Sequence, residues 1–472
     1  MKDGQGLEVA NADADAIEAL DFLRGEWLVG KRVDRFLAAA DKEERCLLLP
    51  VMAANLVLSM NSAEGRARGA KYVARANAIT KGIGEREHAW LAATEAWLAG
   101  ETDKSLAIHE KMVAEWPRDL LAGKLGQLHA VNQGDAEALL RIGEHLVAAN
   151  EDVPFVHGLY AFGLAECHRL DEAEAEARRA IGIERKDPRA HHALAHCLEA
   201  RGRLIEGVAF LQSVADTNNG WPLALFLIDL DRSAEALALF DSRVWVGSKE
   251  SSEDQIDAIS LLARLELGGV DIGARWDDVA PHVEHRLHDH FVPFLDLHTL
   301  YALARAGKPS VTEMLASLED RAEQAKPFER EAWADCAVPA AHGLVAHARS
   351  DHAEAARLLG QAMPHLRPIG GSTAQRALFG AIHLDALIRS GWNDAAVKIL
   401  QADERDRPTV PSTKRALAAL YRKLGRAEQA MTADYQAQQL VKQYAAPVVL
   451  SAAKDLTLAT GSLVAPLDPS LR

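Results

Sequence analysis

A spacing of 34 residues recurs along this chain, and it constrains the fold more than any other feature of the sequence. Three pairs of Pro or small residues show this spacing: Pro154 with Pro188, Ala173 with Gly207, and Ala396 with Ala430. Between these positions apolar residues return with the period of an α-helix, and Gly or Pro closes each helical stretch. The repetition predicts pairs of amphipathic helices that stack side by side along the chain.

A repeat of this length, made of two helices, is typical of the tetratricopeptide repeat (TPR). The composition agrees, because the chain is 49% hydrophobic but only 6% aromatic, and its Ala and Leu residues favour helix. A single compact core seldom grows to 472 residues, so an open array of repeats suits the length. We therefore predict an all-α fold, a TPR-like α-α superhelix that is a right-handed solenoid of helix pairs.

The pattern divides the chain into four ranges. Helical pairs occupy residues 1–84, TPR-like repeats around a polar channel occupy 85–307, further TPR-like repeats occupy 308–445, and a tail occupies 446–472. Clusters of Gly, Pro and polar residues predict loops at 218–222, 247–253 and 363–375.

Charge restricts the partners that this chain is expected to bind. The formal net charge of −15 opposes nucleic acid and anionic membranes, since both attract basic surfaces. The N-terminus is polar and acidic, and no apolar run reaches membrane-spanning length, so a cytoplasmic protein is expected. The exposed ends of a solenoid are compatible with a homodimer.

No cofactor or metal is predicted from sequence motifs. The chain has no Walker loop, no dinucleotide-binding fingerprint and no nucleophile elbow. Its four cysteines, Cys46, Cys167, Cys197 and Cys336, are widely spaced without a CxxC pair. They are expected to be reduced thiols rather than disulfides or zinc ligands.

The first helix of each TPR-like pair lines the concave groove, and polar residues gather at the groove positions of two central units. Counting back from Gly207 and Ala173 gives Arg189, His192, His196 and Glu199 in one unit, and Phe162 and Glu166 in the unit before. Asp257 and Arg264, seven residues apart on one predicted helix face, extend this wall. We predict that these eight residues contact a ligand.

Three functions are compatible with this groove. The first is a binding protein that holds a peptide or a small polar molecule in the channel. The second is a hydrolase- or lyase-type enzyme, because imidazoles four residues apart with a nearby carboxylate suit acid–base chemistry or a metal. Its candidate catalytic residues are His192, His196, Glu199, Asp296 and His298. The third is a scaffold that joins two proteins, with the histidines in structural hydrogen bonds.

Five short segments, in this order, resemble the tetratricopeptide repeat protein 38 family. They are YAFGLAE (160–166), HALAH (192–196), SLLARLE (260–266), RW (275–276) and DLH (296–298). The resemblance spans about 85–307 and implies an α-α superhelix whose central repeats close around a polar interior. It implies no particular activity.

One departure from that family concerns two histidines. Family members carry a His-Asn-Trp-Trp-His run before Leu-Ala-Leu-Phe, whereas this chain has Asn218, Asn219, Gly220, Trp221 and Pro222 before Leu223. Any role that the family's two histidines play is therefore lost here, while His192, His196, Asp296 and His298 are retained.

Overall fold

The chain forms a continuous array of α-helices, seen in a computed structural model that describes residues 1–28, 33–79, 81–214, 219–246 and 249–445. The first twelve are α1 (Ala14–Leu28), α2 (Asp34–Ala40), α3 (Leu48–Leu58), α4 (Ala63–Asn77), α5 (Glu85–Leu98), α6 (Thr102–Glu115), α7 (Leu120–Gln133), α8 (Ala136–Ala149), α9 (Val156–Glu166), α10 (Leu170–Ile183), α11 (Pro188–Ala200) and α12 (Leu204–Ser213). The remaining twelve are α13 (Gly220–Asp229), α14 (Ser233–Leu239), α15 (Ser252–Leu267), α16 (Arg275–Val283), α17 (Pro293–Arg305), α18 (Val311–Glu323), α19 (Val338–Ala348), α20 (His352–Ala362), α21 (Thr373–Arg389), α22 (Asn393–Asp406), α23 (Pro411–Lys423) and α24 (Ala427–Ala445). The described residues contain no β-strand, which confirms the predicted all-α class.

The predicted 34-residue period appears in the backbone of the central units. The turn between the two helices of a pair contains one residue with positive φ, and in four successive pairs this residue is Gly100, Gly134, His168 and Gly202, at φ 70°, 66°, 57° and 64°. These positions are 34 residues apart along the chain. Glycine adopts this left-handed conformation without strain, whereas His168 does so at a cost. The helix pairs from α5–α6 to α11–α12 are therefore equivalent repeats.

Small residues allow neighbouring helices to cross closely. A Cβ on Gly143 of α8 would lie 2.8 Å from Tyr160 Cα of α9, and a Cβ on Gly207 of α12 would lie 2.2 Å from the Phe226 ring. Ala173 is completely buried in α10. A larger side chain at these positions would force the helices apart. The predicted packing role of Ala173 and Gly207 is confirmed.

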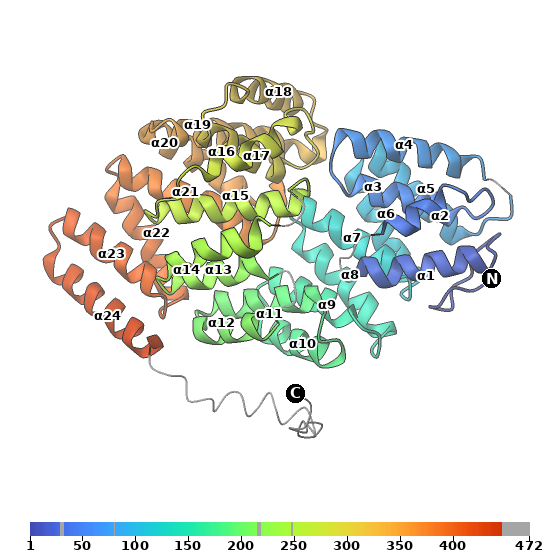
Figure 1. Cartoon of the computed structure of the whole chain (residues 1–472), viewed down its shortest axis with the longest axis horizontal. Helices are drawn as coiled ribbons and strands as arrows, with labels where there is room; N and C mark the ends of the chain where they lie inside the picture. The colour runs from blue at the N-terminus through green and yellow to red at the C-terminus, as the bar shows by residue number, and fades with distance from the viewer. Residues whose placement is uncertain (29–32, 80, 215–218, 247–248, 446–472) are drawn as a thin grey trace, which may run out of the picture.

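The array curves back on itself, so helices of the C-terminal half pack against the central repeats (Figure 1). The short 3₁₀ turn η6 (Arg367–Ile369) packs on α7, α21 packs on α15, and α23 packs on α13. The concave side of the central units is therefore covered by the chain itself.

Residues 367–376, which we call the inserted segment, form the first of these long-range contacts. Arg367 Nε donates to the Gly134 carbonyl over 2.9 Å. The Thr373 backbone N–H lies 3.1 Å from a carboxylate oxygen of Glu166. On the other side, Arg264 donates to the Ala374 carbonyl over 2.8 Å. The segment thus joins α9 to α15 across the groove. Its Thr373 backbone N–H binds the Glu166 carboxylate, which was predicted to contact a ligand.

A second set of contacts closes the far end of the central units. Arg407 lies 2.9 Å from Asp229 and 3.4 Å from Glu199, so one guanidinium joins α11 and α13 to the end of α22. The Thr409 hydroxyl donates to the Gly202 carbonyl over 2.9 Å. These contacts anchor α23 beside α13.

Three predicted loops are shorter than expected. The 363–375 loop contains the 3₁₀ turns η5 (Met363–His365) and η6, and its end is the first turn of α21. Helix α13 begins at Gly220 and α15 at Ser252, inside the predicted loops at 218–222 and 247–253. Asn218 and the predicted tail at 446–472 lie outside the described residues.

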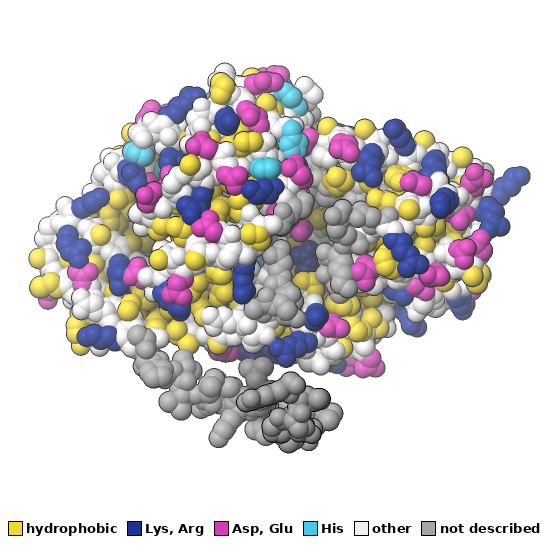
Figure 2. Space-filling view, viewed as in Figure 1, with side chains coloured by type: hydrophobic (Ala, Val, Ile, Leu, Met, Phe, Trp, Pro, Cys, Tyr) yellow, Lys and Arg dark blue, Asp and Glu magenta, His cyan; other side chains and the backbone are white. Residues whose placement is uncertain are grey.

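The surface carries both charges in a mixed arrangement. Figure 2 shows acidic and basic side chains interspersed over the face that it presents, without a large patch of either sign. Among the described helices, none combines the length and the apolar character needed to cross a bilayer. All four cysteines are free thiols, as predicted.

Candidate ligand site inside the central repeats

Helix α11 positions the two histidines around which the predicted site was built. The helix begins at a strong N-cap, because the Asp187 carboxylate accepts hydrogen bonds from the backbone N–H groups of Arg189 and Ala190, at 2.9 and 3.1 Å. The helical period then places His192 and His196 on one face. Their Nε2 atoms are 2.9 Å apart, so one imidazole donates to the other.

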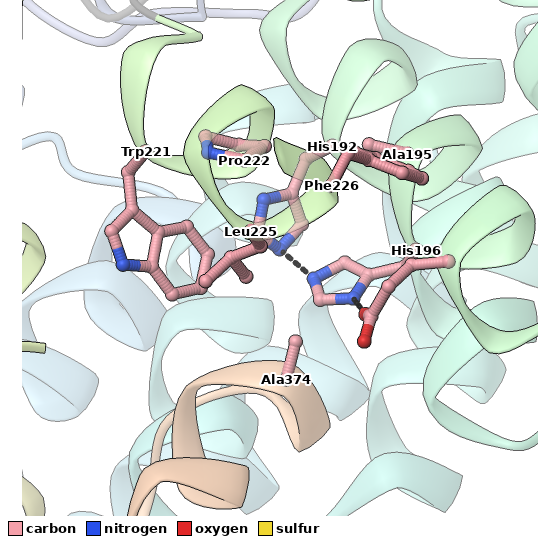
Figure 3. Close-up of a pocket in the computed structure, with 9 residues that line it drawn as sticks. His192, Ala195, His196, Trp221, Pro222, Leu225, Phe226 and Ala374 are labelled. Atoms are coloured by element: carbon pink, nitrogen blue, oxygen red, sulfur yellow. Dashed lines mark hydrogen bonds and ion pairs between the residues drawn. The ribbon is translucent and has the colours of Figure 1, made fainter. Parts of the chain in front are cut away.

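The histidine pair faces the interior of the molecule. Figure 3 shows both rings beside a small cavity, with Trp221 and Ala374 on its other sides. The cavity has a volume of about 10 Å³, room for about one water molecule. Ala374 belongs to α21, so the inserted segment forms part of this cavity wall.

The surroundings keep His192 uncharged. Burial, together with the charges of His196 and Arg189, lowers the pKa of His192 well below its usual value. His196 Nδ1 lies 3.9 Å from Glu199 Oε2, which in turn faces Arg407. The neutral His192 ring therefore acts as a donor or an acceptor in the hydrogen bond between the two Nε2 atoms.

Arg189 and Phe162 lie next to this pair, as predicted. The Arg189 guanidinium lies 5.2 Å from the centre of the Phe162 ring, and this ring meets the His192 ring edge-on at 5.4 Å. The ring of Phe162 is buried, whereas Arg189 is half-buried. No described carboxylate lies within ion-pair distance of the Arg189 side chain.

Arg264 and Asp257 approach from α15. The Arg264 guanidinium lies 5.9 Å from the Trp221 ring and donates to Ser260 as well as to Ala374. Burial lowers its pKa to about 10, so it stays charged at neutral pH. Burial, together with neighbouring acidic groups, raises the pKa of Asp257 well above its usual value, whereas the charge of Arg264 acts to lower it.

Lys124 of α7 is a further cation of this interior, and the sequence reasoning missed it. Burial and the charge of Arg189 lower its pKa to about 8, while Glu253 and Asp187 act in the opposite direction. A signal was present in the repeat, because Lys124 lies 34 residues before Gly158 and 68 before His192. It occupies the same groove position two units earlier.

These charged groups are partly accessible to solvent. Lys124, Arg189, Asp257 and Arg264 are each half-buried. Burial is nevertheless the largest influence on the pKa of Lys124, Asp257 and Arg264. We call the four residues, together with His192 and His196, the inner cluster.

Asp296 and His298, the other two candidate catalytic residues, belong to α17. Asp296 pairs with His290 Nδ1 at 2.8 Å, and His298 Nδ1 donates to the Phe294 carbonyl at 2.8 Å while its ring packs on Phe379. No hydrogen bond among the described residues joins either of them to His192 or His196. The five candidate catalytic residues therefore do not form one hydrogen-bonded group within the described part of the chain.

No protein-family model matches the chain. It is similar to the solved structure titled human IFIT1 dimer with PPP-AAAA, with a TM-score of 0.39 and 14% identity, over 80% of this chain and 87% of that chain. The P58(IPK) TPR domain gives a TM-score of 0.22 and 13% identity, over 80% of this chain and all of that chain. Yeast Tom70 gives 0.29 and 11%, over 79% of this chain and all of that chain.

The chain has a TPR-like fold. Its helix pairs, its 34-residue period and its all-α solenoid are those of the tetratricopeptide repeat. The resemblance to the tetratricopeptide repeat protein 38 family remains a prediction.

Proposed function

We propose that this protein binds a small anionic molecule at the inner cluster. The observation that carries the proposal is that Arg189 and Arg264 approach the histidine pair from two helices and that Lys124 lies near Arg189. No described carboxylate lies within ion-pair distance of these three side chains. Burial favours the uncharged form of the nearby Asp257 carboxyl group, because it raises its pKa well above the usual value. Buried cations without partners are costly, and an anionic ligand would offset that cost.

The three cations of the inner cluster are opposite in sign to the net charge of the whole chain. The chain carries a formal charge of −15, which by itself favours a basic ligand. At short range in a low-dielectric interior, however, the nearest charges dominate the field. The inner cluster therefore selects for a carboxylate, phosphate or sulfate group.

The covered groove favours a small molecule over an extended peptide. The inserted segment and the Arg407 contacts take the place in which a peptide would lie along α9 and α11. His192 and His196 offer one donor and one acceptor to the single water molecule for which the cavity beside them has room.

Calorimetric titration with inorganic phosphate and succinate tests this proposal, with putrescine as the cationic comparison. We expect the anions to bind and putrescine not to bind. In the Lys124→Met variant, anion affinity falls at least tenfold, since loss of a hydrogen bond to a charged group is worth about 1.5–3 kcal/mol. Lys71→Met is the matched control, because Lys71 is exposed on α4.

Three results would overturn the proposal. The first is an equal anion affinity of Lys124→Met and the unmodified protein, and the second is tighter binding of putrescine than of either anion. The third is no anion binding at concentrations up to about 10 mM, which exceeds the largest Kd that we regard as specific.

A further inference from the structure

A second group of polar side chains lies in the C-terminal repeats, apart from the inner cluster. His347 is in the last turn of α19, His352 is the first residue of α20, and Asp385 lies in α21 (Figure 1). One ligand atom from each of the three lies within 4.8 Å of the others. From this arrangement we propose that His347, His352 and Asp385 bind a divalent transition-metal ion, with Zn²⁺ as the ion that fits best.

The donor types and their spacing support this assignment. Imidazole nitrogens and carboxylate oxygens bind Zn²⁺ at about 2.0–2.2 Å, which puts neighbouring ligands of a tetrahedral ion about 3.3 Å apart. His347 Nε2 and Asp385 Oδ2 are already 2.8 Å apart. The rings of His347 and His352 have their centres 5.5 Å apart and are inclined at 69°. The third ligand atom, on His352, lies within 4.8 Å of the other two and has to move closer to them to share an ion.

His352 has a coordination position available. Its Nδ1 atom is buried and has no hydrogen-bond partner in the part of the chain that the structure describes. Burial, with the charges of His347 and Arg389, lowers the pKa of His352, so its ring is neutral at pH 7. A neutral imidazole with an unpaired nitrogen is the form that coordinates a metal.

The other two ligands are held by neighbouring side chains. The Tyr301 hydroxyl lies 3.2 Å from His347 Nδ1, so its oxygen accepts a hydrogen bond from the Nδ1–H group when Nε2 holds the ion. Burial acts to raise the pKa of Asp385, but hydrogen bonds from His347 and Arg389 lower it overall and keep the carboxylate ionised. His347 is 5% exposed, which limits its rotation.

The three residues line a cavity of about 200 Å³. This volume leaves room beside the ion for water or for an exogenous ligand, as in zinc sites with three protein ligands. The wall also contains Arg305, which is paired with Glu266 at 2.5 Å, and Arg389, which pairs with Asp385 at 2.7 Å. Of these two cations, Arg389 competes directly with a metal for the Asp385 carboxylate.

Sequence spacing did not reveal this site. His347 and His352 are five residues apart, which is not a spacing that aligns side chains on one helix. They meet because the chain turns between α19 and α20, where Ser350 has a φ of 64°. Asp385 then arrives from the next helix pair.

Titration of the purified, metal-free full chain with Co²⁺ and Zn²⁺ tests the site. Co²⁺ reports ligand type through its visible absorption, and Zn²⁺ affinity is measured by competition with a chromophoric chelator. We expect one equivalent to bind. His352→Gln lowers Zn²⁺ affinity at least tenfold and changes the Co²⁺ spectrum, and Asp385→Asn has the same effect. Arg389→Gln raises the affinity, because it removes the competing cation.

His365→Ala is the matched control. His365 also pairs with a carboxylate, Glu331 at 3.0 Å, but it does not belong to the three-ligand group. The proposal is wrong if His352→Gln and Asp385→Asn both keep the affinity of the unmodified protein while their circular dichroism is unchanged. Absence of Zn²⁺ and Co²⁺ binding at concentrations up to about 0.1 mM would also overturn the proposal, because protein sites with these ligands bind such ions with a smaller Kd.

Discussion

Replacement of Lys124 by methionine should make the ligand-free protein more stable. Burial lowers the pKa of this lysine from 10.5 to about 8. Each pH unit of this difference corresponds to about 1.4 kcal/mol, so the folded state holds the charged form at a cost of about 3 kcal/mol at pH 7. Methionine has a similar shape and no charge, and it removes that cost.

The sign of the pH dependence follows from proton binding. Because the folded pKa is below the unfolded value, the unfolded state binds more protons between about pH 8 and 10.5, and stability rises with pH in this interval. The advantage of Lys124→Met is therefore largest below pH 8. It falls to about 1.4 kcal/mol at pH 9.5 and disappears above the unfolded pKa.

Thermal unfolding of extensively dialysed protein at pH 7 and pH 9.5 measures this effect. The unfolding entropy of 472 residues is about 1 kcal/mol per kelvin, so the expected rise in Tm at pH 7 is about 3 °C. The exposed control Lys71→Met should change stability by less than about 0.5 kcal/mol. A Tm that stays the same or falls at pH 7, or a gain of equal size at both pH values, would refute the reasoning.

Two further substitutions test the closure and the repeat. Arg407→Ala leaves Asp229 without its cation and should destabilise the protein by about 2–3 kcal/mol, with faster hydrogen exchange in α13 and α23. Arg405→Ala is the control, because Arg405 is exposed. Equal effects of the two substitutions would contradict the proposed closure of the array. His168→Gly relieves a left-handed backbone and should stabilise the protein by about 0.5–1 kcal/mol in thermal unfolding. His145→Gly within α8 should instead destabilise the protein by about 1 kcal/mol. A loss of stability in His168→Gly would show that the backbone of His168, at φ 57°, is not strained.

The sequence was sufficient to predict local structure, because local structure depends on residues that are close in the chain. The 34-residue period predicted the helix pairs, and the helical period predicted that His192 and His196 share a face with Glu199. Both are confirmed by α11 and by the hydrogen bond between the imidazoles. The same reasoning reached Phe162 and Arg189, which lie beside His192.

Only the tertiary structure decided what fills the groove and which distant residues meet. The small rotation between successive repeats accumulates over the array, and the sequence period does not specify which distant repeats this rotation brings into contact. Glu166 therefore contacts Thr373 in place of a ligand, and Arg407 reaches Asp229, 178 positions earlier. Lys124 and Arg264 likewise come from repeats far apart in the chain, and His347 and His352 meet Asp385 only because three helices are packed together.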